Sequence, residues 1–406
     1  MKKVKIIGMN IDDFQKMLED RKNKITAQEA RLIPTYKSEQ NIASVFLASL
    51  PLIKEFQQNF LKQAGLQKGK LYVFTEIQLP LDIDNGKQKR PDGLILKITG
   101  GKIIDAALLE VKHHGNDLKK EQIESYIEVA KQYEIPKIIT ISNQFVNKPT
   151  ESPLHIKTPK AVSLFHFSWS YILTLAHLLL FKADNIKDSD QINIMNEVVK
   201  YFEDPNSGVT GFTKMKTGWK NDIENIRRKI VNEITENIIT SWQQETKDMA
   251  LILSRKCGRL VSTKITKNNS LKLKSTLQMG KTDIVIEADL ISNNVQMSIK
   301  VIPAQDVRIQ TQVHKMEKQI KYVEDSDDLM IGACYKNYKG YEIKHLNDID
   351  KFYADKKKEI KEFLFILNLN YTKQEFASEK RFVEKIEKML LRFHELIIKN
   401  KLGGLK

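Results

Sequence analysis

The sequence predicts an α/β protein in which a first sheet-containing domain is followed by helices and then by a second, smaller α/β domain. Segments with helical periodicity alternate with short β-rich segments, and Pro and Gly residues separate them. The apolar share of 41% is that of an ordinary globular chain, and 406 residues suffice for two or three packed domains. We therefore expect domains at 1–185 and 251–406, joined by a helical linker at 186–250.

The first 185 residues carry the pattern of a sheet flanked by helices. The segment at 103–111 is almost continuously apolar, which is typical of a central strand covered on both faces. The predicted elements are a helix at 38–61 with Ser38 as its N-cap, strands at 71–79, 93–98 and 103–111, a helix at 117–133, strands at 137–142 and 161–167, and an apolar helix from Trp169.

Beyond this domain the pattern becomes helical and then β-rich again. Helices are predicted at 191–201 and 220–249, separated by a loop that contains Pro, Gly and Thr. Residues 251–341 read as strands with one long helix at 305–323. The amphipathic, Lys-rich segment at 348–401 is expected to form two C-terminal helices broken near 368–372.

The charge of the chain favours a polyanionic partner. Lys and Arg number 66 against 51 Asp and Glu, a formal charge of +15, and cations that neutralise phosphates release condensed counterions. Nucleic acid is the expected partner, although a solvated lysine-rich surface is the simpler alternative. The most apolar stretch, 171–181, is shorter than the roughly 20 residues that cross a bilayer, so no membrane contact is expected.

Cysteine usage and the N-terminus predict a cytoplasmic protein. Cys257 and Cys334 are too few for a disulfide framework and have no spacing suited to zinc. The apolar run at the N-terminus is interrupted by Asn10 and Asp12 before a signal-peptide core could form.

Three chemically active side chains are expected to converge in the first sheet. Asp92, after Pro91, begins one strand, and Glu110 and Lys112 project from the same face of the next because strand side chains alternate. A hairpin turned near Gly100 brings Asp92 roughly opposite the other two. Two adjacent carboxylates repel, and a divalent cation removes that repulsion, so magnesium is expected, with manganese as a substitute. The alternative is a salt bridge at a strand end.

These residues resemble the motif of the PD-(D/E)XK nuclease superfamily, over roughly 38–180. Gln122 and Tyr126, one helical turn apart, resemble the Gln-x-x-x-Tyr feature of several of its branches. Glu39 lies where such nucleases often carry an acidic residue on a helix ahead of the sheet. The resemblance implies a restriction-endonuclease-like mixed sheet flanked by helices.

The resemblance also implies a magnesium-dependent DNA endonuclease, in a restriction or anti-phage setting. It assigns the metal to Asp92, Glu110 and the Val111 carbonyl, with Glu39 completing the metal shell directly or through water. Lys112 orients or activates the attacking water, and Gln122 contacts either the scissile phosphate or the neighbourhood of Lys112. Two alternatives stay open: a repair or recombination nuclease that reads DNA structure, and a catalytically silent nucleic-acid-binding assembly protein.

Partners are expected on general grounds. Cutting both DNA strands takes two active sites or two visits, which favours a homodimer, with the second half of the chain as the interface or the DNA-recognition module. No Walker-type phosphate loop is visible, so ATPase function or activation would come from a partner protein.

Further residues allow more than one interpretation. His113 and His114 follow the lysine and either contact phosphate or face solvent. In the second domain, Gln310 follows Lys300 at the separation of Gln122 from Lys112, Ser298 stands in place of the glutamate, and Asp283 lies on an earlier predicted strand. This repeat indicates either a duplicated fold that has lost a metal ligand or an unrelated α/β module.

Overall fold

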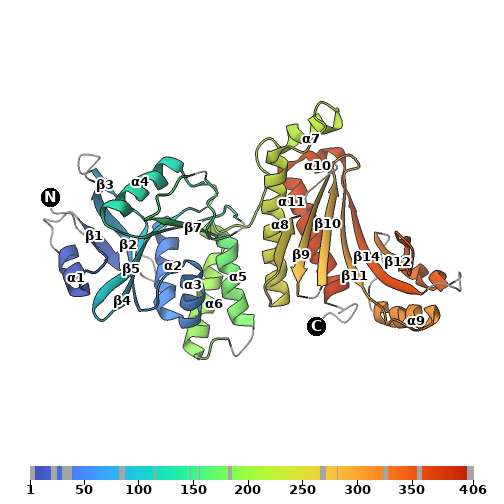
Figure 1. Cartoon of the computed structure of the whole chain (residues 1–406), viewed down its shortest axis with the longest axis horizontal. Coiled ribbons are helices and arrows are strands. Elements are labelled where there is room, and N and C mark those ends of the chain that lie inside the picture. Colours follow the sequence, from blue (N-terminus) through green and yellow to red (C-terminus); the bar gives the residue numbers. More distant parts are fainter. Residues whose placement is uncertain are drawn as a thin grey trace. The chain divides into compact units, whose positions relative to one another are not determined.

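The chain forms two compact units, residues 1–211 and 212–406, each containing a seven-stranded sheet among the residues described (Figure 1). The computed structural model describes residues 5–19, 25–29, 39–81, 87–113, 116–146, 148–154, 156–181, 185–265, 271–280, 282–321, 323, 328–353 and 359–399. The predicted mixed α/β class is confirmed.

The sheet of the first unit is mixed, with the strand order β1-β2-β4-β5-β6-β7 and β3 paired to β2. Its strands are β1 (Thr26–Glu29), β2 (Lys70–Leu81), β3 (Lys87–Lys89), β4 (Gly93–Thr99), β5 (Lys102–Val111), β6 (Lys137–Ser142) and β7 (Ser163–Ser168). The pairs β1–β2, β2–β4 and β4–β5 are antiparallel, whereas the pairs β5–β6 and β6–β7 are parallel. The central strand β5 therefore has one antiparallel and one parallel neighbour.

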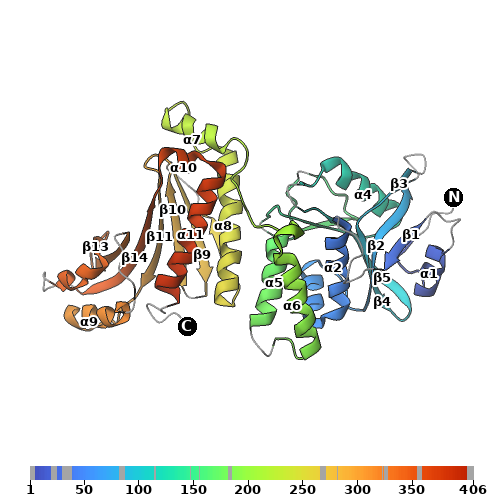
Figure 2. The same ribbon diagram turned by 180° about the vertical axis from the view of Figure 1, so that it is seen from behind.

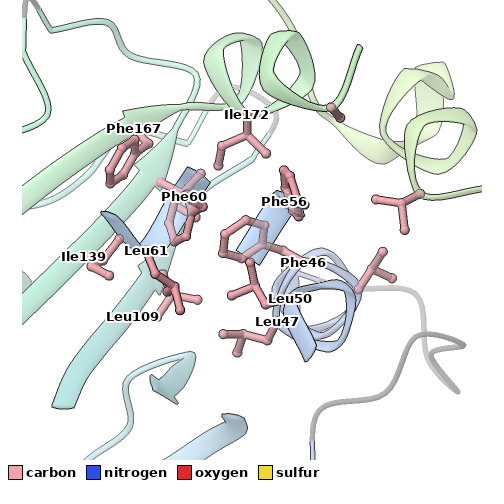
Figure 3. Packing of buried hydrophobic residues seen from close by; sticks show 14 of the residues in the cluster. Phe46, Leu47, Leu50, Phe56, Phe60, Leu61, Leu109, Ile139, Phe167 and Ile172 are labelled. Carbon is pink, nitrogen blue, oxygen red and sulfur yellow. The ribbon is translucent and has the colours of Figure 1, made fainter. Parts of the chain in front are cut away.

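Helices cover both faces of this sheet (Figures 1 and 2). One face carries α2 (Glu39–Leu52), α3 (Lys54–Gln63), α5 (Trp169–Phe181) and α6 (Ser189–Glu203), and the other carries α1 (Ile11–Glu19) and α4 (Lys120–Gln132). On the first face, Phe46 packs edge-on against Phe60, and Phe60 contacts Phe167 (Figure 3). Phe46 also packs edge-on against Trp169. Large buried rings of this kind contribute strongly to core stability.

Glycines shape the hairpin that carries the predicted site. Gly100 and Gly101 turn β4 into β5 with φ of +58° and +76°, a conformation that costs glycine little. At Gly93 a Cβ atom would lie 2.5 Å from Cδ1 of Leu47 and 3.1 Å from the Phe74 carbonyl oxygen. Helix α2 therefore packs directly on the start of β4, one residue after Asp92.

The single helix predicted at 38–61 is two helices. Ile53, with φ −126° and ψ 98°, is extended and separates α2 from α3. Pro51 lies in the last turn of α2 and lacks an amide hydrogen for the helix ladder. The break lets Phe46 of α2 and Phe56 of α3 meet edge-on in one core. Ser38, predicted as the N-cap, lies outside the described residues.

The stretch predicted as a linker at 186–250 is divided between the two units at residues 211 and 212. Helix α6 buries Met195, Val198 and Phe202 in the core of the first unit. The remaining helices of this stretch, α7 (Trp219–Arg227) and α8 (Glu236–Cys257), belong to the second unit. Each helix has an apolar face long enough to pack against its own sheet or helices, so the stretch does not form a separate body.

The sheet of the second unit is entirely antiparallel, with the strand order β13-β12-β14-β11-β10-β9-β8. Its strands are β8 (Ser262–Ile265), β9 (Lys272–Met279), β10 (Thr282–Asp289), β11 (Asn294–Val301), β12 (Leu329–Tyr335), β13 (Glu342–His345) and β14 (Ile360–Asn370). Helix α8 and α11 (Glu379–Phe393) run side by side along it, and α7 lies beside α10 (Lys373–Ala377) (Figures 1 and 2). Helix α9 (Ile309–Ile320) occupies the predicted segment at 305–323.

One expectation about the second unit is corrected. The first of the helices predicted at 348–401 begins within the short 3-10 helix η3 (Leu346–Tyr353), but its second half is the strand β14, which lies between β11 and β12 and buries Phe363, Phe365 and Leu367. A strand covered on both faces is apolar almost throughout, so it resembles a buried helix in sequence. Of the two interpretations of the Ser298–Lys300 repeat, the structure favours an unrelated module, because β11 has antiparallel neighbours on both sides, whereas β5 of the first unit has one parallel neighbour.

Candidate active site

The hairpin β4–β5 places Asp92 beside the end of β5. Gly93 pairs with Leu109, so Asp92 continues the register opposite Glu110. Asp92 Oδ2 accepts a 2.7 Å hydrogen bond from the Val111 amide, and the Asp92 carbonyl accepts one of 2.9 Å from the Glu76 amide. Because a carboxylate held by a backbone amide is positioned by the strand itself, Asp92 has a fixed orientation.

Glu110 and Lys112 form an ion pair that is almost removed from water. Lys112 Nζ lies 2.6 Å from Glu110 Oε1, and the two side chains are 12% and 1% exposed. Burying an ion pair costs free energy of desolvation that the attraction between the charges rarely exceeds. This pair is therefore weak as a stabilising device, and its position at a strand end beside Asp92 favours a functional role.

The backbone at Lys112 is held from two sides. Its amide donates to the Ile141 carbonyl on β6 at 2.8 Å, and its carbonyl accepts a 2.8 Å hydrogen bond from Trp169 Nε1. Trp169 is fully buried. Besides packing in the core, this ring therefore anchors the main chain of the site.

Tyr126 of α4 joins the Gln-x-x-x-Tyr pair to the carboxylates. Gln122 Nε2 donates to the Tyr126 hydroxyl at 3.0 Å, and that hydroxyl donates to the Arg90 carbonyl at 3.2 Å. Burial, followed by the negative charge of Glu110, raises the pKa of Tyr126 well above its usual range, and Asp92 adds to the effect. Tyr126 is thus the member of the pair that lies beside the carboxylates, and Gln122 supports its hydroxyl.

A polar row extends across the parallel strands from Glu110. Glu110 is in register with Thr140 of β6, which is in register with His166 of β7. The Thr140 hydroxyl donates to the Phe165 carbonyl at 3.0 Å and lies 2.9 Å from His166 Nδ1, while His166 Nε2 lies 2.9 Å from the Gln144 carbonyl oxygen. This row was not predicted from the sequence, although polar residues within two apolar predicted strands, Thr140 and His166, could have indicated it.

Glu76 is a third residue near the site that was not predicted from the sequence. It has φ +51°, a left-handed conformation that is uncommon for glutamate, and its amide holds the Asp92 carbonyl. Its carboxylate pairs with Arg90 at 2.7 Å. Non-glycine residues in this conformation are often retained at functional sites, where the surrounding structure compensates the strain.

The donor set suits a cation that keeps much of its own water. Within the described ranges, no three His, Cys, Asp or Glu side chains are grouped closely enough to hold a metal ion. Asp92 and Glu110 offer two carboxylates, and magnesium is usually bound through one or two carboxylates together with water and substrate phosphate. Magnesium therefore fits these residues better than zinc, which takes four protein ligands in closed sites. The Val111 carbonyl as a further ligand stays a prediction.

The positions of Glu39 and of the two histidines after Lys112 are described only in part. Glu39 begins α2, whose residue Leu47 packs on the face of the sheet opposite to α4 and Tyr126. The Glu39 side chain is outside the described part of the chain, so its role as a ligand stays a prediction. His113 is partly buried, and His114 is outside the described residues.

No protein-family model, curated protein or solved structure matches this chain. The proposals below therefore rest on the geometry of the site, on its chemistry and, for the cellular setting, on the resemblance of the motif. Among the described helices, none is long and apolar enough to span a membrane.

Proposed function

We propose that the first unit is a magnesium-dependent nuclease with a restriction-endonuclease-like fold that hydrolyses phosphodiester bonds of DNA. The observation that carries this proposal is the meeting of Asp92, Glu110 and Lys112 at the end of the central strand of a mixed sheet. The excess of basic over acidic residues in the chain also favours a polyanionic substrate.

Each residue has a distinct role in this proposal. Asp92 and Glu110 would hold the magnesium ion, which supplies charge neutralisation and a more acidic bound water. Lys112 keeps a positive charge beside the reacting phosphate, oriented by its contact with Glu110. That charge favours the transition state over the substrate as negative charge develops. Tyr126 and Trp169 position these groups from α4 and α5.

Cleavage of supercoiled plasmid with magnesium, and with EDTA, tests the proposal. Asp92→Asn is the principal variant, because asparagine retains an acceptor for the Val111 amide. We expect it to lower the cleavage rate by a factor of about 10² or more. Lys131→Ala is the matched control, since Lys131 forms an exposed pair with Glu128 on α4 of the same unit. Wild-type-like cleavage by Asp92→Asn would overturn the proposed site.

The cellular setting is proposed by resemblance alone. We propose a cytoplasmic restriction or anti-phage nuclease. It would act as a homodimer or together with a partner protein that activates it. A repair or recombination nuclease would use the same residues, so cleavage of branched against linear DNA by the wild type separates the two roles. A preference for branched DNA would favour repair.

A further inference from the structure

The second unit contains a basic groove between α7 and the segment that holds α10 and the first turn of α11. Its volume is about 780 Å³. The cationic side chains that line it, here called the basic groove residues, are Lys220, Arg227, Arg228, Lys373 and Lys380. Only two lining residues are acidic, Glu224 and Glu379, which leaves a net charge of three positive units.

The positive charges are only weakly compensated. Neither Lys220 nor Lys373 has a carboxylate within ion-pair distance in the part of the chain described, and both are exposed. Arg228 lies 4.0 Å from Glu224, and Lys380 lies 3.5 Å from its nearest carboxylate. Exposed pairs at such distances contribute little free energy, so these cations remain available to a ligand.

One of the two acidic side chains is already engaged. Glu379 Oε1 accepts a 3.3 Å hydrogen bond from the Gly218 amide, and the Glu379 carbonyl accepts one of 3.0 Å from the Met215 amide. These contacts join the loop before α7 to the start of α11. The carboxylate of Glu379 therefore holds the groove together and offsets less of its positive charge.

The walls of the groove are rigid. Trp219 is fully buried, and its Nε1 donates to the Phe376 carbonyl at 2.9 Å. The Arg227 guanidinium donates to the Lys373 carbonyl at 3.1 Å and lies 5.5 Å from the centre of the Phe376 ring. A surface that is already ordered loses less entropy when a ligand binds.

Arg227 lines the groove while part of its guanidinium group is buried. Its Nε atom is buried and has no hydrogen-bond partner among the described residues. Burial lowers the pKa of Arg227, which means that its charge is partly desolvated without full compensation. An anion in the groove would compensate that charge.

The chemistry of the lining favours phosphate groups over an acidic protein. Protein-binding sites are centred on buried aromatic or aliphatic anchors, and the apolar side chain in this lining is only that of Ala377. The lining also has no aromatic ring on which a base could stack. Lysine and arginine on a polar groove make contacts with the phosphate backbone that do not depend on sequence.

We propose that the basic groove residues bind the phosphate backbone of duplex DNA, which makes the second unit a sequence-independent DNA-docking module for the nuclease unit. The inference rests on the proposed DNA substrate, yet it concerns binding and not cleavage. It assigns the strongest backbone contacts to Lys220 and Lys373, whose charges lack local partners among the residues described.

The test is the affinity of the full chain for a fluorescein-labelled duplex, measured by anisotropy in EDTA at several salt concentrations. Lys220→Gln/Lys373→Gln removes two charges from the groove, and we expect the dissociation constant to rise about tenfold or more. The slope of log K against log salt should fall by about two, because each lysine that binds a phosphate contributes about one. Hydrogen exchange of α8 and α11 checks that the second unit of the variant is folded.

The matched control is Lys315→Gln/Lys318→Gln, which removes the same charge from exposed positions on α9 of the same unit. Equal affinity and equal salt slope in the two double variants would overturn the proposal. So would binding of polyglutamate without binding of duplex, since that result points to an acidic protein. If the chain binds DNA through the groove but does not cleave it, the proposed nuclease activity is refuted and the proposed DNA binding by the groove stands.

Discussion

In the first unit, the buried carboxylate of Glu110 lies beside the cation Lys112, whereas in the second unit the fully buried Glu245 lies among like charges, Glu387 and Asp248. Both carboxylates are 1% exposed or less. A neighbouring cation keeps a buried carboxylate ionised, while neighbouring carboxylates favour its protonated form. Burial alone therefore does not decide whether a carboxylate is ionised; the charge of its neighbours does.

The acidic cluster of α8 and α11 consists of Glu245, Asp248 and Glu387. Burial, followed by the charges of Glu387 and Asp248, raises the pKa of Glu245 well above its usual range. Burial and Asp248 raise the pKa of Glu387 to about 7, against an opposing effect of Arg255. Protonation of Glu245 or Glu387 would relieve the repulsion within this cluster.

The largest expected effect on stability comes from breaking the compensated pair. Lys112→Ala leaves Glu110 buried without its cation, and we expect the first unit to lose about 3–5 kcal/mol of unfolding free energy. Amide hydrogen exchange of β5, measured at increasing urea concentrations, reports the loss of unfolding free energy in the first unit. The double variant Lys112→Met/Glu110→Leu should recover most of that stability, and a loss as large as in the single variant would contradict this account.

Replacing a carboxyl group of the acidic cluster should raise the unfolding free energy, whereas Lys112→Ala lowers it. Glu245→Gln cannot ionise, so we expect it to stabilise the second unit at pH 8 by about 1–3 kcal/mol. Hydrogen exchange of α8 and α11 reports this unit separately. A destabilised variant at pH 8 would show that Glu245 is ionised and compensated in the native state.

The same cluster predicts a pH dependence of stability. Because the folded-state pKa values of Glu245 and Glu387 are raised, the native state binds more protons than the unfolded state, and the unfolding free energy falls as pH rises. The contribution of Glu387 is fully present below about pH 4.5 and is lost as pH passes about 7. Melting temperatures of the wild type should decline over this window, and Glu245→Gln should flatten the decline.

A smaller effect is expected from Tyr126. Tyr126→Phe removes the hydroxyl that lies beside Glu110 and accepts from Gln122. We expect the cleavage rate to fall about tenfold or less, in keeping with one hydrogen bond of about 1 kcal/mol. Initial rates at saturating magnesium measure it. If Gln122→Ala proved more damaging than Tyr126→Phe, Gln122 would be the residue that meets the substrate.

The smallest effect belongs to an exposed pair. Lys131→Ala breaks its contact with Glu128, at 45% and 38% exposure, and should change stability by about 0.5 kcal/mol or less. Chemical unfolding measures the change. A cost close to that of Lys112→Ala would mean that burial does not distinguish the two pairs.

The sequence predicts the local parts of this structure better than the long-range ones. The strands on either side of Gly100 are predicted within a residue or so, because turn glycines and apolar runs are local signals. From that hairpin, strand alternation also predicts that Asp92, Glu110 and Lys112 lie together.

What the sequence does not reveal depends on register between distant segments. Thr140 and His166 join Glu110 in one row only because β5, β6 and β7 are parallel and in register. Strand β14 resembles a helix in sequence because its two-sided burial appears only when β11 and β12 flank it. Local periodicity does not contain that information.

The central position of β14 has a consequence for synthesis of the chain. It is the last strand of its sheet to be made, yet it joins β8–β11 to β12–β13. Until Ile360 and the residues after it leave the ribosome, the second sheet exists as two fragments whose edges can pair with other chains. The first unit has all its strands by Ser168 and can fold during that interval. Aggregation during expression should therefore begin in the second unit.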